Sequence, residues 1–487
     1  MTAQPVPKRE FRGVWVQTVG RNEYRTKTPS EVRGYFLYML DEFEKAGFNA
    51  FIFQVRPQAD AFYKSAFEPW SAYLTGQQGL APSPAWDPLE FLVRECHRRN
   101  MEFHAWINPY RVTMSESEIL APTHVYYRHP EWFVTYGGKI YFDPGIPDCR
   151  NFVCSVVKDI VARYDIDAIH IDDYFYPYPE KGLQFPDANS FRMYGLIDGF
   201  LPYQLADWRR ENINKLVRDL KLTIKNLKPW VQLGIAPFGI YRNKSNTRDG
   251  SGSNTSGLQN FDDLYADVLL WQRKGWIDYL APQLYWAIGN KAADYESLIH
   301  WWNSNVKSSL LYIGQHVERS LTANSTTRKS QFSEKMRLER ILPNVEGNCF
   351  WYGYAILDNY GGIADSLQTN YHRYPALIPQ AKRAEKRNYP SEPIELKADW
   401  MPAGYRLRWK VTEEKDETSK PAYYCIYRFG KGEKENFNDA RKIIGITRNR
   451  EYYLPRPDGK TDYKYIVTSV NRLHNESSNG RYIILKH

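Results

Sequence analysis

The chain has 487 residues, of which 43% are hydrophobic and 25% are charged, and its formal net charge is +9. This composition excludes disordered, collagen-like and coiled-coil proteins, and no apolar run is long enough to span a membrane. Lys and Arg are interleaved with Asp and Glu instead of being clustered, which argues against a nucleic-acid partner.

Over the first 370 residues, short apolar runs alternate with amphipathic stretches, a pattern typical of strands alternating with helices. We expect eight strands, at Phe11–Val19, Phe48–Val55, Glu102–Asn108, Ala168–Asp172, Val231–Pro237, Tyr279–Leu284, Leu311–His316 and Cys349–Ile356. We expect helices at Pro29–Ala46, Asp87–Asn100, Asp148–Tyr164, Leu205–Leu227, Phe261–Lys274, Tyr295–Val306, Arg328–Leu342 and Gly362–Thr369. Eight such pairs predict an α/β fold, a (β/α)8 TIM barrel.

The pattern changes after the barrel, which we expect to occupy residues 9–375. A linker rich in Pro and basic residues, 376–390, precedes a segment of short alternating strands, 391–487. The segment predicts a small all-β sandwich, with strands at Ile394–Ala398, Tyr405–Val411, Ala422–Phe429, Lys442–Thr447, Glu451–Leu454, Tyr463–Asn471 and Arg481–Leu485. Trp409, Tyr424, Tyr427 and the stretch DYKYIVTSVNRLHNESSNG resemble a fibronectin type III domain.

Two acidic residues, Asp172 and Asp173, stand where the fourth barrel strand ends. Barrels carry their chemistry on the loops at this end of the strands. Adjacent carboxylates at that position can have pKa values that are pushed apart, as a glycosidic acid and its partner require. The alternative is that the two residues cap the following loop through backbone N–H groups.

Aromatic and polar residues recur at or just beyond the other strand ends. Each alone could be a core residue, but their recurrence indicates a groove in which sugars stack on aromatic faces and hydrogen-bond to polar side chains. The candidate substrate-binding residues are Trp15, Gln17, Gln54, Arg56, Trp106, Asn108, Arg111, His170, Tyr174, Tyr285, Trp286 and Trp351. The aromatic content of 15%, with 37 Tyr and 15 Trp, agrees with such a groove.

Other chemistries have less support. The sequence contains no Walker, HExxH or GxSxG motif, and the five cysteines include no CxxC pair, so we expect no cofactor and no metal. A metal site built from His104, His170, Asp172 and His316 is the enzymatic alternative, and a non-catalytic glycan-binding protein is the other. The Gly/Ser/Asn-rich stretch 245–257 is either a mobile flap or a disordered insertion.

Nine segments within residues 9–375 resemble the glycosyl hydrolase-like 10 family of bacterial cell-envelope proteins: FRGVWVQTV, GFNAFIFQVRPQADAFY, FEPWSAYLTG, AWINPYRV, DAIHIDDYFYP, DWRRENIN, APFGIYRN, DDLYADVLLWQRKGWIDYLAPQLYW and WYGYAIL. The resemblance implies a (β/α)8 glycoside hydrolase. An activity characterised in that family is cleavage of denuded peptidoglycan, glycan strands without stem peptides. The family motifs place Asp172 and Asp173, Glu68, and Tyr285 with Trp286 among the functional residues.

This substrate implies further expectations. Its lactyl carboxylates would suit Arg56 and Arg111 at the rim of the groove. Because this substrate lies outside the cytoplasm, we expect a protein of the cell envelope, with an export signal that is absent from the sequence shown. Because the sugars carry 2-acetamido groups, Asp172 and Asp173 could divide the work between them, one orienting the acetamido oxygen and the other donating the proton. Glu68 is the alternative proton donor, and another N-acetylated or capsular glycan is the alternative substrate.

Overall fold

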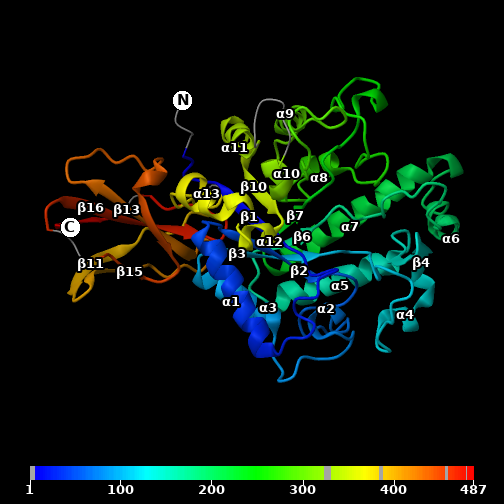
Figure 1. Ribbon diagram of the computed structural model, residues 1–487, viewed down its shortest axis with the longest axis horizontal. Helices are drawn as coiled ribbons and strands as arrows, with labels where there is room; N and C mark the ends of the chain where they lie inside the picture. The colour runs from blue at the N-terminus through cyan, green and yellow to red at the C-terminus, as the bar shows by residue number, and fades with distance from the viewer. Residues whose placement is uncertain (1–5, 323–330, 383–387, 456–458, 479, 487) are drawn as a thin grey trace.

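The computed structural model describes residues 6–322, 331–382, 388–455, 459–478 and 480–486. Figure 1 shows a barrel with surrounding helices in the centre and on the right, and a β-sandwich on the left that contains the C-terminus. No helix within these described ranges is long and apolar enough to cross a membrane.

Eight parallel strands form a closed barrel in the described chain, in the spatial order β1-β10-β9-β8-β7-β6-β3-β2, which confirms the predicted TIM barrel. The last strand lies earlier than predicted, since β10 ends at Trp351 and Gly353 begins a short helix. An apolar run does not by itself distinguish a strand from a buried helix. The strands are β1 (Phe11–Val16), β2 (Ala50–Arg56), β3 (Glu102–Ile107), β6 (Ala168–Ile171), β7 (Gln232–Ile235), β8 (Tyr279–Leu280), β9 (Leu310–His316) and β10 (Val345–Trp351).

The helices surround the barrel, and most lie where the periodicity predicts them. The predicted helix at Phe261 begins only at Val268, because the Asp267 side chain caps it by accepting from the Leu270 N–H. Residues 328–330 of another predicted helix lie outside the described residues. The helices are α1 (Pro29–Lys45), α2 (Ala72–Thr75), α3 (Pro88–Arg98), α4 (Val125–Arg128), α5 (Pro147–Arg163), α6 (Ala188–Ser190), α7 (Leu205–Leu227), α8 (Val268–Lys274), α9 (Tyr295–Asn305), α10 (Val317–Thr322), α11 (Phe332–Ile341), α12 (Gly353–Leu357) and α13 (Ile363–Ser366).

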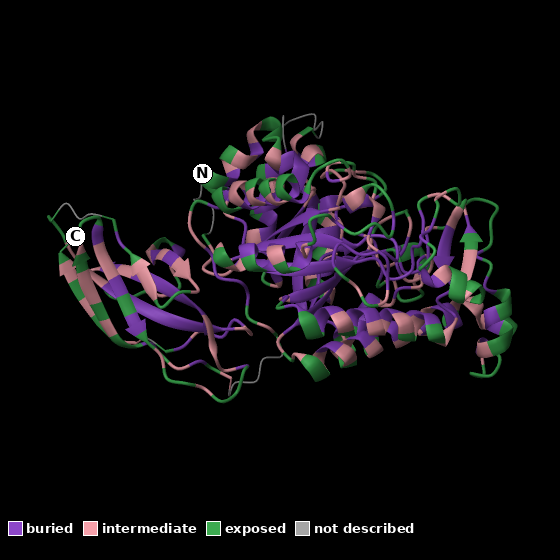
Figure 2. Ribbon diagram, turned by 90° about the horizontal axis from the view of Figure 1, so that it is seen from below, coloured by how far each residue is buried: buried purple, intermediate pink, exposed green. Residues whose placement is uncertain are grey.

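The barrel interior is filled with side chains and is not an open channel. Phe11 stacks on Tyr312 with ring centroids 3.9 Å apart, and Tyr279 packs beside both. The buried strands form the continuous purple centre of Figure 2. Because the interior is packed, ligands have access only to the two ends of the barrel.

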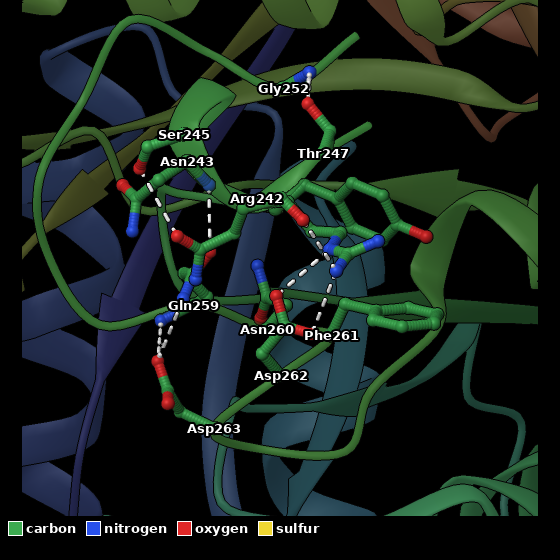
Figure 3. Close-up of polar contacts among 12 residues, drawn as sticks. Arg242, Asn243, Ser245, Thr247, Gly252, Gln259, Asn260, Phe261, Asp262 and Asp263 are labelled. Atoms are coloured by element: carbon green, nitrogen blue, oxygen red, sulfur yellow. Dashed lines mark hydrogen bonds and ion pairs between the residues drawn. The ribbon is translucent and has the colours of Figure 1, made fainter. Parts of the chain in front are cut away.

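Two of the long loops at the carboxyl ends of the strands are structured. The loop after β3 contains the hairpin of β4 (Phe133–Tyr136) and β5 (Lys139–Phe142). In the loop after β7, Figure 3 shows Arg242 paired with Asp262 and the Gly252 N–H bonded to Thr247. Trp301 of α9 also donates to the Ser251 carbonyl at 2.8 Å. The stretch 245–257 is therefore anchored at its base and its tip, unlike a disordered insertion.

The C-terminal strands form two antiparallel sheets, as the sequence predicts. They are β11 (Ile394–Met401), β12 (Gly404–Lys410) and β15 (Glu451–Tyr453) in one sheet, and β14 (Ile443–Thr447), β13 (Pro421–Gly430), β16 (Asp462–Asn471) and β17 (Tyr482–Lys486) in the other. Arg472, just after β16, forms a two-bonded ion pair with Asp165 at the amino-terminal end of β6. The sandwich thus contacts the amino-terminal ends of the barrel strands, opposite to the long loops.

Candidate active site

A cavity of about 490 Å³ opens at the carboxyl end of the barrel strands. It brings together nine of the predicted site residues with Tyr178, Ala236, Phe238, Gln283 and Arg319. The nine are Trp15, Trp106, His170, Asp172, Asp173, Tyr174, Tyr285, Trp286 and Trp351.

Asp172 lies buried on the floor of the cavity, just beyond β6. Its carboxylate accepts from Trp106 Nε1 at 3.1 Å and from Asn108 Nδ2 at 3.0 Å. Burial raises its pKa, while the charge of Arg111 and these hydrogen bonds act in the opposite direction. Two fixed donors therefore hold the Asp172 carboxylate in one orientation.

Asp173 is also buried, but other groups surround it. It accepts from the Tyr178 hydroxyl and, at 3.1 Å, from Gln283 Nε2. Burial, and then the negative charge of Asp172, raise the pKa of Asp173 to about 6. The two neighbouring carboxyl groups thus differ in their partners, and Asp173 can hold a proton close to neutral pH.

Aromatic rings form the walls of the cavity. Trp351 lies 6.2 Å from Trp106 and 6.5 Å from Tyr285, centroid to centroid. Trp286 meets Phe238 edge to face at 5.4 Å. Such rings present flat apolar faces to the C–H surfaces of a sugar, while the carboxylates lie between them.

A chain of buried hydrogen bonds leads from the cavity through the barrel interior. Trp15 Nε1 donates to His170 Nε2 at 3.0 Å, and the Tyr279 hydroxyl lies 2.8 Å from both His170 Nδ1 and His104 Nδ1. His104 Nε2 lies 2.9 Å from the Glu102 carboxylate. Both ring nitrogens of His104 and His170 are thus engaged within the protein, so neither imidazole has a nitrogen free for a metal ion.

The other end of this series of hydrogen bonds, at Glu102, contacts the sandwich. His474 Nε2 lies 2.8 Å from the second oxygen of Glu102. Burial raises the pKa of Glu102, but His474 and His104 outweigh it and bring that pKa to about 2. Glu102 is therefore ionised at the barrel floor, between one histidine from each part of the chain.

Six of the predicted residues do not line the cavity. Glu68 and Arg56 form an ion pair, in which Arg56 Nε donates to Glu68 Oε2 at 2.8 Å. Both side chains are inaccessible to solvent. Arg111 donates to the Pro57 carbonyl, and Gln54 accepts from the backbone N–H groups of residues 18 and 19. Gln17 lies outside the cavity lining, and Asn108 reaches the site only through Asp172.

Five lining residues are absent from the predicted site, Ala236 among them. Gln283 precedes the predicted pair Tyr285 and Trp286 by two residues, so period-two alternation on the strand could have identified it. Tyr178, Phe238 and Arg319 lie on loops or on a loop-borne helix, where spacing does not indicate direction.

A closed parallel barrel with two neighbouring carboxylates among aromatic walls has the construction of a glycoside hydrolase. The chain belongs to the glycosyl hydrolase-like 10 family, whose model matches residues 10–332, and it is a glycoside hydrolase. The glycosyl hydrolase YngK of Bacillus subtilis is 42% identical over 482 residues, which are 96% of this chain and 92% of that protein.

Two further comparisons cover less of the chain. The glycosyl hydrolase DigH of Escherichia coli is 36% identical over 326 residues, which are 62% of this chain and 72% of that protein. The glycoside hydrolase domain of PgaB (BpsB) from Bordetella bronchiseptica has a TM-score of 0.47 at 12% identity, over 74% of this chain and 98% of that one.

Proposed function

We propose that this glycoside hydrolase cleaves N-acetylated glycan strands of the bacterial cell envelope, with peptide-free peptidoglycan as its substrate. The observation that carries the proposal is the pair Asp172 and Asp173, buried side by side in an aromatic cavity with different hydrogen-bond partners. We further propose that residues 9–375 form the catalytic domain and that residues 391–487 form a separate module joined through residues 376–390. Such a substrate places the protein outside the cytoplasm.

The surroundings of the two carboxylates support a division of roles. Asp173, with its pKa raised to about 6, is the proton donor to the glycosidic oxygen. Asp172, fixed by Trp106 and Asn108, orients the substrate's 2-acetamido group. Glu68, which pairs with Arg56 away from the cavity, has a structural role in this proposal.

The proposed reaction has two steps. In the first, the acetamido oxygen bonds to the anomeric carbon, the bond from that carbon to the leaving oxygen breaks, and Asp173 gives its proton to that oxygen. In the second, water attacks the anomeric carbon, the acetamido oxygen leaves, and the proton released from water returns to Asp173. The substrate supplies its own nucleophile, so no third carboxylate is needed.

The test measures new reducing ends from denuded peptidoglycan, chitin oligosaccharides and a capsular glycan without acetamido groups. We expect turnover of the two N-acetylated glycans, and a loss of at least about 100-fold in Asp172→Asn and Asp173→Asn. Asp198→Asn, at an exposed acid on the same loop, is the matched control. Binding without any new reducing ends would favour a glycan-binding protein, and full activity in either catalytic variant would contradict the paired mechanism.

A further inference from the structure

The charges around the cavity are divided between two sides. Asp172 and Asp173 follow β6, and Arg319 lines the cavity from α10, which follows β9. Strands β7 and β8 separate these two in the barrel order. A substrate that fills the cavity therefore meets negative charge on one side and positive charge on the other.

A second cation lies behind the positive side. Lys335 of α11 is buried, and its ammonium group donates to the carbonyl of Trp286 at 2.8 Å and to Ser320 Oγ at 3.0 Å. His316, at the end of β9, stays neutral at pH 7, because burial, and then the charges of Arg319 and Lys335, lower its pKa to about 4.

Arg319 is available to a ligand. It is the only cationic side chain that lines the cavity within the described residues, and its side chain is exposed. Its guanidinium makes no hydrogen bond or ion pair with any part of the chain that the structure describes. A guanidinium of this kind can bind a carboxylate through two parallel hydrogen bonds.

The two arginines that the sequence suggests for such a carboxylate are already occupied. Arg56 binds Glu68, and Arg111 donates to the Pro57 carbonyl and approaches the ring of Tyr174 at 5.4 Å. Neither guanidinium lines the cavity. A carboxylated substrate would be repelled by Asp172 and Asp173 unless its own carboxylate lay on the opposite side.

We infer that Arg319 binds a carboxylate substituent of the substrate and selects acidic glycans over neutral ones. The inference rests on the proposed function and adds a residue and an orientation to it. The lactyl-bearing sugar lies toward β8 and β9, and the bond to be cut lies toward β6. Arg319 is then a specificity-determining residue that takes no part in proton transfer.

The test compares three substrates with the full-length protein: denuded peptidoglycan, the same strands with their lactyl carboxylates converted to methylamides, and chitin oligosaccharides. We expect Arg319→Gln to lower kcat/KM about 10- to 100-fold on the acidic strands, mainly through KM, and to change the other two less than about twofold. Arg319→Lys should retain part of the preference. Arg192→Gln, at an exposed arginine that bonds only to Asn189 in the described chain, is the control.

Equal losses on all three substrates, or no loss on the acidic strands, would overturn the inference. If the wild-type protein cleaves none of the glycans, the proposed function fails, and calorimetric binding of the same three glycans decides the role of Arg319. An affinity that depends on both the carboxylate and Arg319 would then support it. An affinity that is indifferent to either, or no binding at all, would overturn it.

Discussion

The substitution Glu68→Gln separates a structural from a catalytic role for a carboxylate in the family's Glu-Pro-Trp-Ser loop. Arg56 Nε lies 3.0 and 2.8 Å from the two Glu68 oxygens, and both side chains are inaccessible to solvent. Arg56 also donates to the carbonyls of Asn108 and Pro109, so the pair supports the segment that presents Asn108 to Asp172.

Removing one partner of a buried ion pair typically costs about 3–5 kcal/mol, because the remaining charge is left uncompensated. Glutamine keeps one oxygen as an acceptor, so we expect Glu68→Gln to lower the free energy of unfolding by about 3 kcal/mol. Urea unfolding measures this change, and kcat on denuded peptidoglycan should fall less than about threefold in the folded variant.

A double variant provides the control. Arg56→Met with Glu68→Leu removes both charges and keeps apolar volume, so it should recover at least half of the lost stability. A Glu68→Gln protein that unfolds like the wild type but loses kcat by about 1000-fold would refute the structural role. Glu68 would then be the proton donor, and a movement of its loop would have to bring it to the cavity.

Three further predictions concern titratable groups. Because burial and the Asp172 charge raise the pKa of Asp173 to about 6, kcat/KM should fall as the pH rises above about 6, and a flat profile from pH 5 to 8 would contradict the assignment. Because the pKa of Asp173 is higher in the folded than in the unfolded protein, its ionisation lowers the free energy of unfolding above about pH 6. Below about pH 4 it has no such effect. Asp173→Asn should therefore gain up to about 3 kcal/mol in urea unfolding at pH 8 and little at pH 4, and equal effects at both values would exclude this cause. His474→Leu should lower the free energy of unfolding by about 3 kcal/mol at pH 7, and His474→Gln should lower it by less. Since the pKa of Glu102 is low in the folded protein, this deficit should shrink as the pH falls toward 2. A deficit that stays constant with pH would contradict the ion pair between His474 and Glu102.

The sequence predicts the barrel well because each strand and helix has its own periodicity, which needs no knowledge of distant contacts. It also places Asp172 and Asp173 at the cavity, since both follow a parallel strand at its carboxyl end. The predicted position of β10 (Val345–Trp351) is wrong because its segment is a continuous apolar run. Such a run has no periodicity that distinguishes a strand from a buried helix.

Partners of loop residues are the part that the sequence leaves undetermined. Arg56 follows the pattern of a rim residue. Glu68, twelve residues further along the chain, folds back to pair with it, and both side chains are buried. Arg319 carries no motif and reaches the cavity only because α10 follows β9 directly. Such pairings depend on how loops fold back over the barrel, which local spacing does not encode.

The buried series of hydrogen bonds from Trp15 to Glu102 permits one arrangement of protons. The Trp15 indole can only donate, so His170 Nε2 accepts and its Nδ1 carries the proton toward Tyr279. The Tyr279 hydroxyl must then donate to His104, whose Nε2 proton points to the Glu102 carboxylate. His170 therefore has no free nitrogen and, since burial and then the neighbouring His104 lower its pKa well below the usual range, no charge. Although it lines the cavity, it cannot exchange a proton with a substrate, which agrees with the proposal that Asp173 carries the proton transfers.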